Sequence, residues 1–77
     1  MIRLEHREPV RNCHRFYLIS VMPTLFGEWA VVREWGRIGS HGGRLELWFE
    51  SEAQALDEAM KRCRQKQRRG YALITLL

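Results

Sequence analysis

The fold is decided where the chain reads RLELWFE at residues 44–50 and then SEAQALDEAMKRCRQKQRRG at residues 51–70. The first run alternates apolar and polar residues, which predicts a strand with one face on a core and the other in water. In the second run apolar residues recur at steps of three and four, which predicts an amphipathic helix. Because this helix follows the strand directly, we expect it to cover one face of a largely antiparallel sheet.

Signals at both ends mark the limits of the helix. Ser51 and Gln54 have the spacing of a capping box, and Gly70 is well placed to end the helix after its basic residues. The apolar stripe predicted to lie on the sheet consists of Ala53, Leu56, Ala59, Met60 and Cys63. On this basis we interpret Met60 as a core residue.

Further strands are indicated by β-branched and aromatic residues at 2–8, 15–22, 28–38 and 71–77. The first of these, which Pro9 ends, could be an edge strand, and the second should be a central strand. Turn residues at 23–27 connect the second and third strands into a predicted antiparallel hairpin. Leu25 and Phe26 at its tip are expected to fold back onto the core, and the alternative is that they mark a contact patch.

These elements together predict a small α+β fold. Its sheet has about five strands, the order along the chain is β-β-β-β-α-β, and one helix packs on the sheet. A chain of 77 residues has room for one domain, so residues 1–77 are predicted to form a single unit.

Several classes of protein are disfavoured by the sequence. No apolar run approaches the roughly 20 residues that span a bilayer, and the N-terminus lacks the apolar region of a secretory signal, so a cytoplasmic location is expected. Cys13 and Cys63 stand fifty positions apart without a CxxC pair, which argues against disulfides and structural zinc. Because no nucleophile, base and metal-ligand set is apparent, we predict a protein that is not an enzyme and uses no cofactor or metal.

The charge of the chain favours an anionic partner. The net charge is +4, and eleven of the thirteen basic residues are arginine, whose planar guanidinium fits phosphate. A GC-rich genome would produce the same enrichment. Arg62, Lys66 and Arg69 share a helix face that could meet phosphates, although cations at this end also complement the helix dipole.

The run Glu34-Trp35-Gly36-Arg37-Ile38-Gly39-Ser40 places an aromatic and a guanidinium beside glycines at a strand end. Trp35 and Arg37 have the same parity, so both side chains are expected on one face of the sheet, and Gly36 should leave the opposite face bare. Such a surface could stack on and hold the end of a nucleic acid.

The segment from residue 12 to residue 71 resembles the WGR domain, a family named for the tripeptide found here at residues 35–37. The other matching features are aromatic Phe16 and Tyr17, loop glycines Gly39 and Gly42, and a basic helix end followed by Gly70 and Tyr71. The chain looks like the short free-standing bacterial members of this family.

The resemblance implies a non-catalytic module that holds a DNA end, as in poly(ADP-ribose) polymerases. Trp35 would then be the stacking platform, and Arg37 would bridge to phosphate or to another protein. The predicted function is nucleic-acid binding, with DNA favoured over RNA, through Trp35, Gly36, Arg37, Arg33, Arg44, Arg62, Lys66 and Arg69.

Two other interpretations remain open. The chain could be a protein-interaction or regulatory adaptor, or a homodimer, in which Trp35, Arg37, Arg33 and Trp29 form a hot spot. Alternatively, Trp35 could be a core residue and the two residues after it could simply end a strand.

Overall fold

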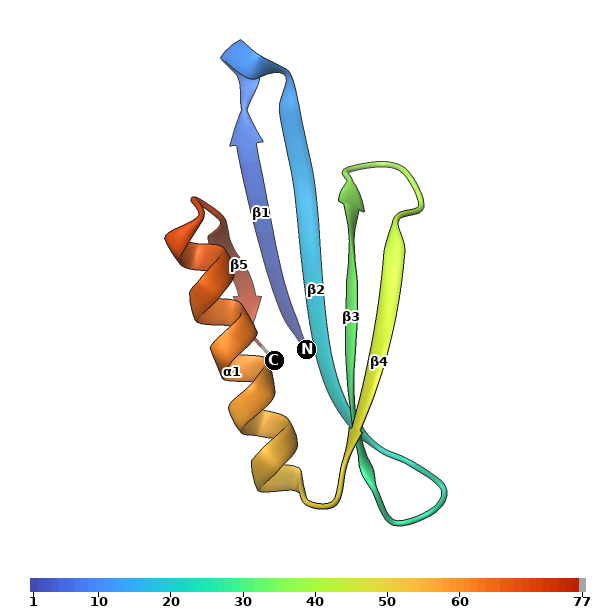
Figure 1. Ribbon diagram of the computed structural model, residues 1–77. Helices are drawn as coiled ribbons and strands as arrows, with labels where there is room; N and C mark the ends of the chain where they lie inside the picture. Colours follow the sequence, from blue (N-terminus) through green and yellow to red (C-terminus); the bar gives the residue numbers. More distant parts are fainter. Residues whose placement is uncertain (77) are drawn as a thin grey trace.

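One helix crosses one face of a five-stranded antiparallel sheet whose strand order is β4-β3-β2-β1-β5 (Figure 1). This computed structural model describes residues 1–76, and Leu77, the last residue of the predicted final strand, lies outside the described residues. The elements are β1 (Ile2–Glu8), the 3-10 turn η1 (Pro9–Arg11), β2 (Cys13–Pro23), β3 (Trp29–Arg37), β4 (Gly43–Phe49), α1 (Glu52–Arg68) and β5 (Ala72–Leu76). The predicted α+β class and element order are confirmed.

The prediction that the first strand is an edge strand is wrong. After α1 the chain returns to the sheet as β5 and pairs with β1, with Leu73 opposite Leu4 and Leu76 opposite Ile2. The strand lies inside the sheet because its second neighbour comes from the far end of the chain. The edges are β4 and β5, and β2 is central as predicted.

The strand register sorts side chains onto two faces. Tyr17 lies opposite Trp35 and Val21 lies opposite Val31, so these residues share the face that α1 covers. The core between sheet and helix is formed by Ile2, Leu4, Tyr17, Ile19, Val31, Ala55, Ala59 and Cys63.

Both predicted helix ends are confirmed. The Ser51 hydroxyl accepts a hydrogen bond from the Gln54 N–H at 3.2 Å, and the Gln54 side-chain oxygen accepts one from the Ser51 N–H at 3.3 Å. Gly70 has a φ of +96°, a conformation that favours glycine, and the Tyr71 N–H then bonds back to the Lys66 carbonyl at 3.0 Å.

The predicted apolar stripe of the helix is right at Ala59 and Cys63 and wrong at Ala53, Leu56 and Met60. Ala55, Ala59 and Cys63 are 0%, 2% and 4% exposed, whereas Leu56 and Met60 are 47% and 41% exposed. Ala53 is also exposed. The small residues at steps of four let the helix backbone approach the bulky side chains of the sheet. The larger Leu56 and Met60 lie on the flank of the helix.

The tip of the β2–β3 hairpin does not fold back onto the core as expected. Leu25 and Phe26 are 97% and 77% exposed. The Thr24 hydroxyl accepts hydrogen bonds from the N–H groups of Phe26 and Glu28, at 3.3 and 3.2 Å, which closes the turn locally. Phe26 lies near Trp48 of β4 instead, with ring centroids 6.4 Å apart.

Both cysteines are free. Cys13 is half-buried and Cys63 is buried, and burial raises the pKa of the Cys63 thiol. Within residues 1–76 we find no helix with the length and apolar character needed to cross a membrane.

We expect Ala59→Leu to lower the free energy of unfolding by about 1–3 kcal/mol, because the added atoms must separate α1 from the sheet. Ala53→Leu, on the exposed side of the same helix, should change it by less than about 0.5 kcal/mol. Urea denaturation of both variants measures the difference, and equal effects would contradict the packing described here.

Candidate nucleic-acid interface

Two hollows meet beside the C-terminal half of α1, where the β1–β2 hairpin extends past the helix end (Figure 1). The larger, of about 420 Å³, is lined by Arg11, Arg15, Trp35, Gly36, Arg37, Lys66 and Tyr71 among others. The smaller, of about 240 Å³, is lined by Tyr17, Arg33, Trp35, Arg62, Gln65, Lys66 and Arg69. Trp35 and Lys66 belong to both, and the two hollows together are called the basic cleft below.

Trp35 is held by neighbours on two adjacent strands. Its indole stacks on the Tyr17 ring, with centroids 6.3 Å apart and an interplanar angle of 20°. On β4 it lies against Gly43, where an added Cβ atom would come within 2.5 Å of the indole ring. Since Trp35 is still 38% exposed, it is a fixed surface residue and does not belong to the core.

The expectation that Gly36 leaves the opposite face of the sheet bare is wrong. A Cβ atom at Gly36 would lie 2.8 Å from the Gly42 Cα and 3.4 Å from the Phe16 ring. The glycine-rich loop therefore crosses this face in direct backbone contact with Gly36. Glycine allows two backbones to approach this closely because it has no side chain. The loop then continues into Gly43, against which the Trp35 indole lies.

Lys66 stands at the centre of the cleft among other cations. Its ammonium lies 4.6 Å from the centre of the Tyr17 ring and 5.3 Å from that of Tyr71. Burial lowers the pKa of Lys66, and four guanidiniums act in the same direction: Arg69, Arg33, Arg15 and Arg62. Both effects act against the charged form of the amine, and an anion beside Lys66 would act in the opposite direction.

Arg33 supplies a donor in the wall of the smaller hollow. One terminal nitrogen donates to the Tyr17 hydroxyl at 3.4 Å. Its Nε is buried and has no hydrogen-bond partner among residues 1–76. A buried donor left without a partner is costly to stability.

Seven of the eight predicted site residues line the basic cleft, and Arg44 does not. Arg44 follows the alternation of β4 onto the opposite face, where its guanidinium lies 3.5 Å from carboxylate oxygens of both Glu34 and Glu46. Within the cleft, Arg62 is already paired with Glu58 at 2.7 Å. Trp29, proposed above for an adaptor surface, packs against the core at the other end of β3.

Arg11 and Arg15 are cleft residues that the sequence did not reveal. The register places Arg15 directly opposite Arg37 on the helix-covered face, and η1 brings Arg11 to the rim. Arg15 is two residues from Tyr17 on the same strand, so the sequence predicts that both side chains lie on one face of the sheet. That this face is the one with Trp35 and Arg37 follows only from the pairing of β2 with β3.

Gly43→Ala is expected to displace the Trp35 indole from the Tyr17 ring, because the new methyl group occupies part of its position. The Trp35 indole N–H resonance should shift in a heteronuclear NMR spectrum. The control is Gly39→Ala in the same loop, where an added Cβ atom would have no other atom within 4 Å. Gly39 has a φ of +89°, a conformation that strains an alanine. The control variant should leave the Trp35 indole resonance in place. A shift of equal size in both variants would contradict the contact between Gly43 and the indole.

Inorganic phosphate should raise the melting temperature of the protein through the cations around Lys66, by mass action on the folded state. Lys66→Gln is expected to reduce this increment, whereas Lys61→Gln, an exposed position of the same helix, should retain it. Thermal denaturation in phosphate and in chloride of equal ionic strength separates the specific effect from screening. Equal increments in both variants would exclude Lys66 from anion binding.

Comparison with known proteins agrees with the resemblance noted in the sequence. The WGR domain model matches residues 1–75, so the match includes β1 and most of β5 as well as the segment 12–71. Uncharacterised protein y4dW of Sinorhizobium fredii is 40% identical over 68 residues, which cover 88% of this chain and 33% of that protein. The chain thus spans about a third of the length of this relative. No solved structure matched. The chain belongs to the WGR domain family.

Proposed function

We propose that this chain is a non-catalytic, single-domain module that binds nucleic acid and prefers the ends or breaks of DNA. The observation that supports it most directly is the position of Trp35, an exposed and immobilised indole at the junction of two cationic hollows. A nucleotide stacked on this indole would have cations within reach on both sides.

The preference for an end follows from what an indole can contact. Bases inside a duplex are already stacked on their neighbours, so an aromatic platform fixed in a sheet can meet only a terminal or unstacked nucleotide. Lys66 and Arg33 would donate hydrogen bonds to the phosphate on one side of the indole, and Arg37 and Arg15 would donate to the phosphate on the other. The preference for DNA over RNA rests on the family resemblance, which is to modules that hold DNA ends.

Membership of the family supports the same class of ligand. The WGR domain is known as a nucleic-acid-binding module of poly(ADP-ribose) polymerases, where it is not the catalytic unit. In this chain Arg62 of the cleft is paired with Glu58, and Arg37 is the cleft arginine beside the motif tryptophan.

The proposal is tested by fluorescence anisotropy with labelled nicked, blunt and single-stranded DNA at two salt concentrations. Trp35→Ala should weaken binding about 5- to 100-fold, the usual contribution of one aromatic–base stack. Lys66→Gln should lower the slope of log affinity against log salt by about one. Phe26→Ala, which removes an exposed aromatic ring far from the cleft, should leave affinity unchanged.

Undetectable binding at low salt, or binding unaffected by Trp35→Ala, would exclude the proposed site. The preference for ends is measured separately, by competition between a covalently closed circle and the same DNA made linear. If the closed circle and the linear DNA compete equally per unit length, the preference for ends is contradicted and nucleic-acid binding itself is not.

A further inference from the structure

A third hollow adjoins the basic cleft at the C-terminal end of α1. Its volume is about 350 Å³, and its walls include His6, Glu8, Arg11, Arg15, Lys66 and Arg69. Lys66 lines all three hollows, whereas Trp35 lines only the first two, so the third hollow lies beyond Lys66 as seen from the indole. The cationic surface therefore continues past the place where a nucleotide would stack on Trp35.

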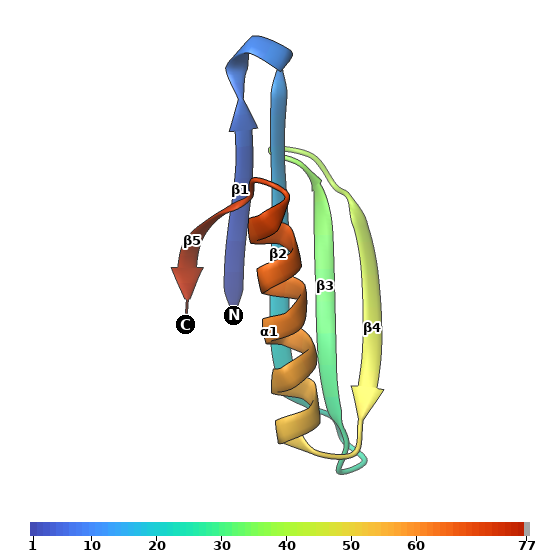
Figure 2. The same ribbon diagram turned by 60° about the vertical axis from the view of Figure 1, so that its left-hand side comes forward.

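The lengths of the strands explain why this hollow is open. β5 pairs with β1 only as far as Glu5, and the β1–β2 hairpin runs on past the end of α1 and the start of β5 (Figure 2). In this part of the hairpin, His6 lies opposite Arg15 and Glu8 lies opposite Cys13. The hairpin thus forms one wall of the third hollow, and the last turn of α1 forms the other.

The third hollow carries positive charge that nearby carboxylates do not neutralise. Three of its cations form no ion pair with a carboxylate among residues 1–76: Arg15, Lys66 and Arg69. Glu8 is the one described carboxylate that lines any of the three hollows, and it already has two partners, His6 at 2.7 Å and Arg11 at 3.5 Å. A ligand with several phosphates suits this arrangement.

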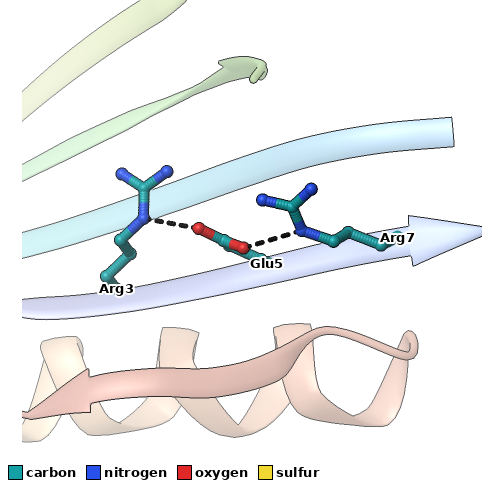
Figure 3. Close-up of polar contacts among 3 residues, drawn as sticks. All are labelled: Arg3, Glu5 and Arg7. Atoms are coloured by element: carbon teal, nitrogen blue, oxygen red, sulfur yellow. Dashed lines mark hydrogen bonds and ion pairs between the residues drawn. The ribbon is translucent and has the colours of Figure 1, made fainter. Parts of the chain in front are cut away.

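The cations on the other face of β1 do not belong to this surface. Arg3 lies over the Phe16 ring, 5.5 Å from its centre, on the side of the sheet away from α1. Arg3 and Arg7 both pair with Glu5, at 2.8 and 3.0 Å (Figure 3), and their hydrogen bonds lower the pKa of its carboxyl. Because this cluster contains its own anion and lies across the sheet, a strand that leaves Trp35 meets the cations of the third hollow instead.

The third hollow suits the backbone of one strand and offers no platform for a base. Its aromatic wall is Tyr71, which is half-buried, has the Lys66 ammonium 5.3 Å from its ring centre, and is in edge contact with the His6 ring at 5.2 Å. The volume of the hollow is near the lower end of ligand pockets, which hold roughly 300–1,000 Å³. A sugar and its phosphate fit such a space, whereas a double helix stays outside it.

From these observations we infer that the third hollow holds the backbone of an unpaired strand, so that the preferred DNA end is one with a single-stranded overhang. The inference rests on the proposed function, because Trp35 must hold the nucleotide at the end of the duplex. The next nucleotides then pass over Lys66 and reach Arg69 and Arg11. Since this hollow contacts phosphates and sugars, the preference does not depend on the base sequence of the overhang.

The test uses labelled hairpin DNA with one closed end, so that each molecule offers a single open end to the protein. That end is blunt or carries a 5′ or 3′ overhang of about one to six nucleotides, and fluorescence anisotropy measures the affinity. At low salt, an overhang of at least one polarity should bind about three- to tenfold more tightly than the blunt end. Its slope of log affinity against log salt should be steeper by about 1.4, because each of two single-strand phosphate contacts adds about 0.7.

Two double variants with the same loss of charge separate the third hollow from general electrostatic attraction. Arg11→Gln with Arg69→Gln should bring the ratio of overhang to blunt-end affinity close to one. Arg64→Gln with Arg68→Gln changes exposed positions of α1 that line none of the three hollows, so this control should leave the ratio unchanged. Glu8→Gln removes the carboxylate of the third hollow and should raise the ratio about twofold.

If blunt ends bind through Trp35 and no overhang of either polarity binds more tightly, the inference is overturned and the proposed function stands. An equal fall of the ratio in both double variants, each folded by circular dichroism, would also overturn it, because the third hollow would then have no special part. If no DNA binds at low salt, or if binding does not depend on Trp35, the proposed function itself fails and this inference fails with it.

Discussion

Close packing of α1 on the sheet through Ala55, Ala59 and Cys63 sets the position of the helix residues that line the basic cleft. These residues are almost completely buried, and their small side chains bring the helix close to Tyr17, Ile19 and Val31. With the helix held there, its C-terminal turns place the Lys66 ammonium over the Tyr17 ring and close one side of the basic cleft. A bulkier stripe would raise the helix and open the cleft.

Each residue of the WGR tripeptide has a different physical role at the end of β3. Trp35 supplies a flat apolar surface, which Tyr17 and the backbone at Gly43 hold in place. Gly36 allows the following loop to cross the sheet in backbone contact, a path that any side chain would block. Arg37 stands beside Trp35 on the same face and adds a cation to the larger hollow.

The cations of the cleft lie close together without enough carboxylates to neutralise them, which is the observation behind the proposed phosphate contacts. Lys66 has a lowered pKa because it is partly buried and faces four arginines, and Arg33 has a buried nitrogen with no partner among residues 1–76. Both features cost folding free energy, and an anion bound beside Lys66 would offset the first of them. On the other face the charges behave differently, because Glu5 and Arg44 each join two groups of opposite charge.

The sequence by itself determined the elements, because alternation, helical period, the capping box at Ser51 and the glycine at Gly70 act through neighbours along the chain. It also determined that Trp35 and Arg37 share a face. Only the tertiary structure decided that β1 is interior, that Met60 lies on the helix flank and that Arg15 joins the cleft. Each of these positions depends on which strand or surface from a distant part of the chain packs beside it, and on how closely it packs. A local sequence pattern does not encode either of these.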